Sequence, residues 1–249
     1  MGEQPFVKTG PVSALDMFEA EAEGLREIAA TDTIRVPNVI DCGTRNDEAF
    51  IALENLSFGR ADKAVERTLG EQLAAMHGHT SDQHGWHRDN TIGLTPQHND
   101  RSSDWVGFFR EHRLLFQLRL AAKNGYMGEL QELGNDLAGN LDALFDGYDP
   151  APSLLHGDLW AGNWGAVDGE PVIFDPAAYY GDRETDIAMT YVFGGFGHAF
   201  YEAYESNWPL DEGFAHRNAL YQLYHILNHL NLFGSGYLGR AMSLLARLT

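Results

Sequence analysis

The chain has 249 residues, 44% of them hydrophobic, which is enough apolar material for one large domain or for a small lobe beside a larger one. Its formal net charge of −19 repels nucleic acid and anionic lipid, so neither is expected as a partner, and its single cysteine, Cys42, excludes an internal disulfide and a thiolate zinc site. No apolar run reaches the roughly 18 residues of a membrane span and the start lacks the pattern of a secretion signal, so we expect a cytoplasmic protein.

The acidic residues are scattered along the chain, and the sequence has only three lysines, Lys8, Lys63 and Lys123. Such a surface favours a halophilic protein, because dense carboxylates keep it soluble while salt screens their mutual repulsion. The hypothesis predicts that added KCl does not steadily lower the stability of the fold.

The first 57 residues predict a small α/β lobe. Pro5 to Lys8 is a short apolar run, and apolar residues recur at helical spacing from about Asp16 to Ala30. Two β-rich runs follow, Asn38–Gly43 and Ala49–Leu53, and the turn-prone residues between them predict a hairpin. The expected order is therefore strand, helix, strand, strand.

Residues 58–249 predict a larger, mainly helical lobe. Apolar spacing indicates one helix from Asp62 onward and a longer one from Trp105 to near Gly125. The stretch Ser153–Asp175 differs, because two short apolar runs there predict small strands that flank a loop. Helical spacing returns over Gly213–Leu248, where a glycine-containing break predicts two helices.

The loop between those two small strands carries the most informative spacing. Asp158 precedes Asn163 by five positions, and Asp175 ends the next apolar run. Phosphoryl transfer requires a carboxylate that accepts the proton of an attacking hydroxyl, and oxygen ligands that hold Mg²⁺ on the nucleotide phosphates. Asp158 suits the first role, and Asn163 with Asp175 suits the second. The alternative is that all three only form turns and caps. The matched spacing favours a kinase that uses ATP and Mg²⁺.

A kinase also needs a lysine on a strand to hold the nucleotide phosphates, and a helix glutamate to orient it. Lys8 closes the first apolar strand. The next helix offers three candidates, Glu19, Glu21 and Glu23. Glu21 lies nearest the apolar stripe and is expected to face inward, while the others suit a solvated face. The strand that runs into the lobe boundary, with Glu54 and Leu56, is where backbone groups are expected to bind adenine.

Two groups of histidines offer alternative metal sites. One is the pair His225 and His229, four residues apart on an expected helix, and the other is the cluster His77, His79, His84 and His87. The pair lacks the interposed glutamate of a metalloprotease, and the cluster has irregular spacing. A structural or surface role is therefore favoured for both groups.

The runs Leu154–Asn163 and Phe174–Asp182 resemble the fructosamine (ketosamine) kinases, which belong to the protein-kinase-like superfamily with the aminoglycoside and choline kinases. The resemblance extends to Phe6–Lys8, Met17–Glu21, Asp104–Trp105, Phe108–Phe109, Phe193–Phe196 and Tyr221–Gly234. It implies an α+β, two-lobed protein-kinase-like fold. It also implies ATP-dependent phosphorylation of the 3-hydroxyl of fructosamines or ribulosamines, after which the product falls apart and releases the amine.

The resemblance also implies roles for individual residues. Asp158 would be the catalytic base, Asn163 and Asp175 the Mg²⁺ ligands, and Lys8 the phosphate-binding lysine with Glu21 as its partner.

Three further residues gain expected roles from the same resemblance. Trp160 is well placed to stack on the substrate, because an indole attracts a cationic amine and covers the apolar face of a sugar; its alternative role is to pack the loop onto the helical lobe. His156 would support the loop from beneath. Asp186 would brace it.

Members of that family begin with two further strands and a glycine-containing loop, whereas the expected phosphate lysine is already Lys8. We therefore expect a truncated nucleotide-binding lobe, a lowered ATP affinity and an open strand edge at Phe6–Lys8 through which a homodimer could form. One alternative is a kinase-fold protein with little or no turnover. Another is an aminoglycoside or choline kinase, although the sequences that begin at Asp158 and Asp175 favour the ketosamine branch.

Overall fold

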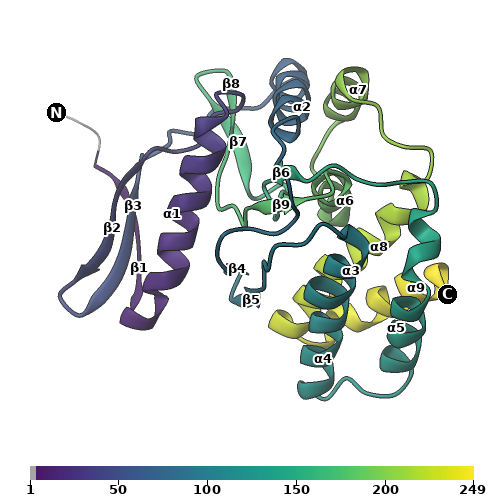
Figure 1. Cartoon of the computed structure of the whole chain (residues 1–249). Coiled ribbons are helices and arrows are strands. Elements are labelled where there is room, and N and C mark those ends of the chain that lie inside the picture. Colours follow the sequence, from purple (N-terminus) through teal and green to yellow (C-terminus); the bar gives the residue numbers. More distant parts are fainter. Residues whose placement is uncertain (1–3) are drawn as a thin grey trace.

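The computed structural model describes residues 4–249, which form a small lobe beside a larger, mainly helical one (Figure 1). In the small lobe an antiparallel sheet has the order β1-β3-β2, and α1 packs against it through Phe18, Leu25 and Ile28. The bounds are Phe6–Pro11 for β1, Leu15–Ala30 for α1, Val39–Arg45 for β2 and Glu48–Leu53 for β3. The predicted order of strand, helix, strand, strand is confirmed.

The predicted hairpin joins β2 and β3 through a two-residue turn. Arg45 pairs with Glu48, and the residues between them, Asn46 and Asp47, have φ angles of 52° and 61°. Positive φ at both central positions matches the right-handed twist of a hairpin, and asparagine and aspartate tolerate it better than most residues. The turn chemistry of the sequence therefore fixes the register of this pair of strands.

The larger lobe begins with α2 (Lys63–His77), where the Asp62 carboxylate accepts hydrogen bonds from the backbone nitrogens of Ala64 (2.9 Å) and Val65 (3.1 Å). This capping by an aspartate satisfies two amides that have no partner in the first turn. The long helix predicted from Trp105 is present in three continuous parts. These are α3 (Trp105–Phe109), a π-helical stretch (Arg110–Leu115) and α4 (Phe116–Lys123).

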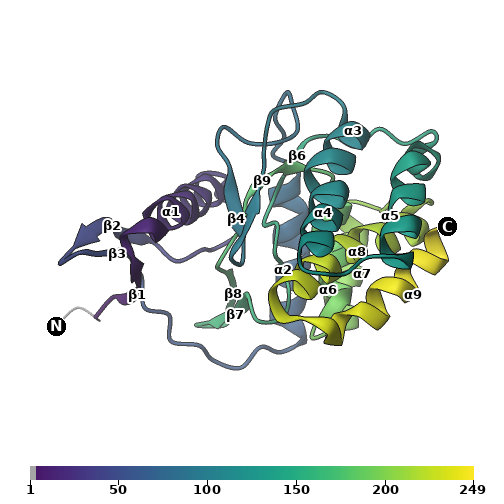
Figure 2. The ribbon, with the colours of Figure 1, turned by 90° about the horizontal axis from the view of Figure 1, so that it is seen from below.

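Of the other helices, α4, α6 and α9 contact α8, while α7 packs on α2 and α5 packs on α9 (Figure 2). Most residues of α8 are buried, as expected for a helix enclosed by others. The bounds are Glu129–Gly139 for α5, Glu184–Phe193 for α6, His198–Asn207 for α7, Phe214–Phe233 for α8 and Leu238–Leu248 for α9. The predicted break between two C-terminal helices is confirmed.

Three short antiparallel pairs complete the larger lobe. They are β4 (Asn90–Ile92) with β5 (Thr95–Gln97), β6 (Ser153–Leu155) with β9 (Tyr179–Gly181), and β7 (Trp164–Val167) with β8 (Glu170–Ile173). The strands predicted on either side of the loop correspond to β6 and β8. The other four were not predicted, because they are as short as β6 and β8 but lack the apolar run that marked those two.

The two lobes meet through backbone hydrogen bonds as well as side chains. The amide of Ile173 in the larger lobe donates to the carbonyl oxygen of Arg35 in the small lobe (3.0 Å). At the start of the larger lobe the amide of Gly59 donates to the Ala166 carbonyl oxygen (2.8 Å). The β7-β8 pair therefore lies against the small lobe, which it contacts through Ile173 of β8.

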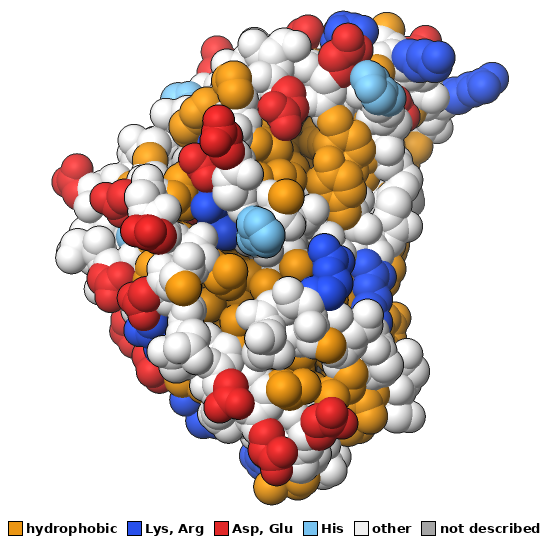
Figure 3. Space-filling view, turned by 90° about the vertical axis from the view of Figure 1, so that its right-hand side faces the viewer, with side chains coloured by type: hydrophobic (Ala, Val, Ile, Leu, Met, Phe, Trp, Pro, Cys, Tyr) orange, Lys and Arg blue, Asp and Glu red, His pale blue; other side chains and the backbone are white. Residues whose placement is uncertain are grey.

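Acidic side chains are dispersed over the face seen in Figure 3, where hydrophobic side chains gather in a hollow. Within residues 4–249, none of the helices combines the length and the apolar character that crossing a membrane would require.

Candidate active site

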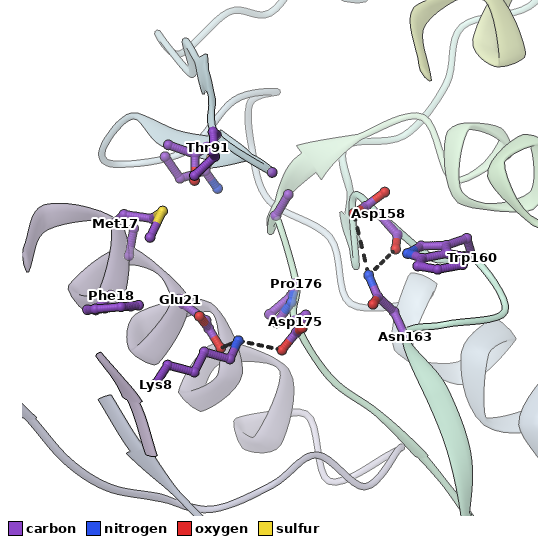
Figure 4. Close-up of a pocket in the computed structure, with 15 residues that line it drawn as sticks. Lys8, Met17, Phe18, Glu21, Thr91, Asp158, Trp160, Asn163, Asp175 and Pro176 are labelled. Atoms are coloured by element: carbon purple, nitrogen blue, oxygen red, sulfur yellow. Dashed lines mark hydrogen bonds and ion pairs between the residues drawn. The ribbon is translucent and has the colours of Figure 1, made fainter. Parts of the chain in front are cut away.

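A cleft between the lobes is lined by residues from β1, α1, the β4-β5 hairpin, the loop after β6 and the segment after β8 (Figure 4). Six residues that the sequence singled out line this one cleft: Lys8, Glu21, Asp158, Trp160, Asn163 and Asp175. They come from segments that lie far apart in the chain, so the fold gathers them.

The loop His156–Asn163, here named the catalytic loop, is held from below by Asp186 of α6. This buried carboxylate accepts hydrogen bonds from the backbone nitrogens of His156 (2.7 Å) and Gly157 (2.8 Å). Gly157 has φ +82°, and a Cβ at this position would collide with the carbonyl oxygen of Ala177. Only glycine fits this turn, and Asp186 holds it in the bracing position that the resemblance implied.

Two buried histidines, His77 and His156, complete the support beneath the catalytic loop. His77 contacts the Asp186 carboxylate through Nε2 (3.1 Å) and the Tyr204 hydroxyl through Nδ1 (2.8 Å). His156 donates from Nε2 to the Phe174 carbonyl oxygen (2.9 Å), so it supports the loop from beneath as expected. Burial alone would raise the pKa of Asp186, but the hydrogen bonds from His77 and the loop amides hold it below its ordinary value. The histidine spacing gave no signal of this role for His77.

Asp158 projects from the catalytic loop into the cleft. Burial, followed by the nearby charges of Asp186 and Asp175, raises the pKa of Asp158 to about 7. The Asn163 side-chain amide donates to the Asp158 carbonyl oxygen (2.9 Å) and lies 3.4 Å from its carboxylate (Figure 4). A carboxylate that titrates near neutral pH can accept a proton from a hydroxyl group efficiently.

Lys8 of β1 lies across the cleft from Asp158, where it forms ion pairs with two carboxylates. Its Nζ lies 2.8 Å from Glu21 Oε1 and 2.6 Å from Asp175 Oδ1 (Figure 4). Burial would lower the pKa of Lys8, but the two carboxylates outweigh it and raise that pKa, so the ammonium stays charged. Burial raises the pKa of Glu21 in spite of the lysine. Of the three candidate glutamates on α1, Glu21 is the one that contacts Lys8.

The donor set suits a magnesium ion. Asp175, with its side chain 46% exposed, and Asn163 offer hard oxygen atoms to the same cleft. Over residues 4–249 there is no cluster of three histidine, cysteine, aspartate or glutamate side chains that could hold a metal by itself. An ion here would therefore depend on Asn163, Asp175 and oxygens from a bound nucleotide, which is how Mg²⁺ is commonly held.

Trp160 lies at the rim of the cleft with 38% of its surface exposed. Its ring meets Phe193 of α6 edge to face, with centroids 5.9 Å apart, and Phe193 in turn lies 4.8 Å from His229. A Cβ on Gly162 would collide with the indole. The loop therefore packs onto the helical lobe through one edge of Trp160, while part of the ring stays open to the cleft.

A second cavity adjoins the first and shares Asp175 with it. It is lined by Glu54 and Leu56, with Phe6, Pro37, Leu53, Asn55, Phe58 and Phe174. The Glu54 carboxylate is engaged by Arg35 (2.6 Å) and by the side chain of Asn38 (2.9 Å). In the described part of the chain no hydrogen bond uses the Glu54 carbonyl oxygen or the Leu56 amide. Their predicted contact with adenine stays a prediction.

Sequence reasoning missed the wall formed by the β4-β5 hairpin, which brings Asn90, Thr91, Gly93 and Leu94 to the cleft. The only signal was the glycine at the tip, which has φ +59°. Met17 and Phe18 of α1 also line the cleft.

The histidine groups do not build metal sites in the described residues. Burial lowers the pKa of His225 to about 3, and His229 donates back to the His225 carbonyl oxygen (2.8 Å). Burial likewise lowers the pKa of His84 to about 4. The interpretation of these residues as structural agrees with this geometry.

Comparisons with known proteins agree with the fold and the site. The model of the fructosamine kinase family matches residues 1–249. A probable ketoamine kinase of Synechocystis sp. is 48% identical, over 98% of this chain and 83% of its own. A chloroplastic protein-ribulosamine 3-kinase of Arabidopsis thaliana is 46% identical, over 96% of this chain and 74% of its own.

Solved structures give the same result. A crystal structure assigned by name as a fructosamine-3-kinase from Haemophilus somnus matches with a TM-score of 0.91 at 32% identity, over 98% of this chain and 83% of that one. An aminoglycoside phosphotransferase in complex with gentamicin matches with a TM-score of 0.65 at 16% identity, over 99% of this chain and 85% of that one. The second likeness shows the shared two-lobed, protein-kinase-like fold alone.

Proposed function

The chain belongs to the fructosamine kinase family, and from this premise we propose that it transfers the γ-phosphoryl group of ATP to a hydroxyl group of a ketosamine. The observation that carries the proposal is the convergence of Lys8, Glu21 and Asp175 with Asp158 and Asn163 on one cleft. The 3-hydroxyl of a fructosamine or ribulosamine is the proposed acceptor, and the names of the relatives support it.

The nucleotide would enter with adenine against the backbone of Glu54 and Leu56 and its phosphates toward Lys8. Lys8, which now contacts Asp175, would then hold the phosphates while Glu21 keeps it oriented. Mg²⁺, held by Asn163 and Asp175, would neutralise charge that develops on the phosphates during transfer. The two walls of the cleft would thus meet at the transferred group.

Asp158 would position the acceptor hydroxyl and take up its proton as the bond to phosphorus forms. Its raised pKa suits this step because a base near neutrality combines an ionised resting state with affinity for a proton. The open part of the Trp160 ring would cover the apolar face of the sugar and attract the protonated amine.

Two alternatives are less well supported. An aminoglycoside or choline kinase would share the fold, but the likeness to gentamicin-bound phosphotransferase has only 16% identity, against 46% for the ribulosamine kinase. A protein without turnover would not need all of the chemical groups that meet in the cleft. Their joint presence favours a working kinase.

The proposal is tested by ADP release from Mg²⁺-ATP with a ribulosyl or fructosyl amine, with the matching unglycated amine as control. We expect the wild type to release ADP with the ketosamine but not with the unglycated amine, and Asp158→Asn to release it at least about 10²-fold more slowly. Release with gentamicin or choline but not with a ketosamine would favour another branch of the superfamily. Equal background in the wild type and the variant would contradict catalysis.

We also propose a homodimer through β1, in the cytoplasm. β1 pairs only with β3 in the described sheet, and its exposed Phe6 (51%) and Val7 (47%) could contact a second copy. Light scattering would show a dimer that Val7→Lys shifts toward monomer. A monomer at all concentrations would contradict this proposal.

A further inference from the structure

The segment Trp86–Asn99, here named the strap, leaves the larger lobe after α2, passes beside α1 and returns to α3 through the β4-β5 hairpin (Figures 1 and 2). Its first residues contact acidic side chains of α1. The Arg88 guanidinium forms ion pairs with the carboxylates of Asp16 and Glu23, and His87 Nε2 lies 2.7 Å from Glu23 Oε2. The strap therefore holds α1 at its start and at its middle.

A third attachment lies one turn further along α1, at Glu27. This carboxylate accepts hydrogen bonds from the indole nitrogen of Trp86 and from the hydroxyl of Tyr180 in β9 (2.8 Å). Between these attachments a Cβ on Gly24 would stand 3.1 Å from the Cβ of Ala178. α1 thus lies in direct contact with the chain that follows Asp175.

The far end of the strap is rooted in the core of the larger lobe by buried polar side chains. Asn90 donates to the Ala178 carbonyl oxygen (2.8 Å) and accepts from the side chains of Gln97 (2.9 Å) and Asn99 (2.9 Å). Asn99 accepts from Arg113 (2.7 Å), and Gln97 accepts from Tyr224 (2.7 Å). Because all are nearly fully buried and paired, this root is expected to be rigid.

The π-helical stretch explains how Arg113 reaches this root. An extra residue in the turn redirects side chains, and the Arg113 guanidinium also donates to the His98 carbonyl oxygen (2.6 Å) and lies 4.2 Å from the centre of the Tyr179 ring. The π-helical stretch, which no sequence pattern predicted, thus connects the strap to the helical core through Arg113.

We infer that the strap is the element that fixes α1 against the larger lobe and so sets the positions of Glu21 and Lys8, with Arg88 and Glu27 as positioning residues. Neither of the two lines the cleft. The same strap supplies the cleft wall formed by Asn90, Thr91, Gly93 and Leu94. The catalytic part of this inference rests on the proposed function, while the structural part does not.

The effect on catalysis follows from geometry. Lys8 is oriented by Glu21, and Glu21 sits on α1 between the attachments at Asp16 and Glu27. A helix freed from the larger lobe would let the lysine drift, and a displacement of about 1 Å in a reacting group can cost 10²-fold in rate. Exposed ion pairs are weak one by one, so the double variant should show the largest effect.

The test compares Glu27→Ala, Arg88→Ala and the double variant with Arg26→Ala, a matched control on an exposed position of the same helix. In the double variant we expect amide hydrogen exchange in α1 to rise at least about tenfold while exchange in α2 stays unchanged. We also expect kcat with Mg²⁺-ATP and a ketosamine to fall about 10- to 100-fold.

Two conservative variants keep the test decisive if the double variant does not fold. Glu27→Gln retains one acceptor oxygen, for either Trp86 or Tyr180, and Arg88→Lys retains a charge for Asp16 and Glu23. Both should therefore recover part of the lost kcat and of the slow exchange of α1. A purely structural role would instead lower the melting temperature without changing kcat at a temperature where the fold is intact.

Wild-type exchange in α1 together with wild-type kcat in the double variant would overturn the inference. If the wild type releases no ADP with any ketosamine, the proposed function fails. In that case the role of the strap is still tested by amide exchange in α1 and by the affinity for a non-hydrolysable ATP analogue, each compared between the wild type and the double variant.

Discussion

The two walls of the cleft are built in opposite ways. The catalytic loop stands on Asp186, His77 and His156, all 0% exposed and joined by hydrogen bonds inside the larger lobe. Lys8 stands on β1, an edge strand of the described sheet whose residues are exposed or half-buried. One wall is fixed from beneath by the core, and the other is fixed from outside by a helix and a strap.

This difference separates stability from activity. Buried charged groups that lose a partner destabilise a fold strongly, whereas contacts near the surface contribute little. Damage below the catalytic loop should therefore lower both stability and activity. Damage at the lysine wall should lower activity with a small effect on stability.

The largest effect is expected at Asp186, which tests whether the catalytic loop depends on the buried core. Asp186→Ala leaves the His156 and Gly157 amides and the His77 ring without their buried acceptor. We expect the free energy of unfolding to fall by about 3–5 kcal/mol and activity to be lost, as measured by urea unfolding and ADP release. Asp186→Asn, which keeps one carbonyl acceptor, should be milder. An alanine variant of wild-type stability would mean that the loop does not stand on this residue.

Asp158→Asn separates the two properties within the same wall. Activity should fall by about 10²- to 10⁴-fold, because the hydroxyl loses its proton acceptor. Stability should change in the opposite direction. The folded state raises the pKa of Asp158 from 3.8 to about 7. The protonated side chain therefore contributes its full share to the free energy of unfolding below about pH 4, and this share is lost as the pH rises through 7.

The neutral variant escapes this loss, so at pH 8 it should be more stable than the wild type by about 1–3 kcal/mol, with the difference vanishing near pH 4. Urea unfolding at both pH values measures it. The acid limb of the wild-type kcat/KM profile should lie near or below pH 7. A pH-independent stability difference would show that the carboxylate is not strained by burial.

Lys8→Met tests the lysine wall. We expect kcat/KM for ATP to fall about 10²-fold, because the phosphates lose a positioned cation. The melting temperature should fall less than in Asp186→Ala: Glu21 loses its partner, but the Lys8 side chain is 25% exposed and the variant keeps an aliphatic stem. Lys8→Arg should retain part of the activity. Loss of folding in the methionine variant would show that the two walls are less different than their burial indicates.

Trp160→Ala should give the smallest effect. The ketosamine loses an aromatic surface, so its KM should rise about five- to tenfold, while the KM for ATP stays the same. Trp160→Phe, which keeps an aromatic face and can still meet Phe193, serves as the control. A change in the KM for ATP alone would place the indole on the nucleotide side of the cleft.

The sequence could predict features that depend on local spacing. Helical periodicity identified α1 and α8, the Asn46-Asp47 turn identified the β2-β3 hairpin, and the spacing of Asp158, Asn163 and Asp175 identified the catalytic loop. The choice of Glu21 over its neighbours also followed from periodicity, because one face of a helix meets the core.

Features that depend on distant contacts could not be predicted. Arg88 and Glu23 are 65 residues apart, and His77 and Asp186 are 109 apart, so no spacing pattern links them. The β4-β5 hairpin is too short for periodicity, and the π-helical stretch has no sequence signature. Positioning contacts between residues far apart in the chain, such as Arg88 with Glu23, were thus harder to find than the candidate catalytic residues, whose spacing is local.

The most direct test of the central claim follows the phosphoryl group itself. A ribulosyl-lysine substrate is incubated with Mg²⁺-ATP and the products are resolved by mass spectrometry for the wild type and Asp158→Asn. The account predicts a singly phosphorylated ketosamine that later yields free lysine, with the wild type alone. Formation of ADP without a phosphorylated ketosamine, or equal product from the variant, would contradict it.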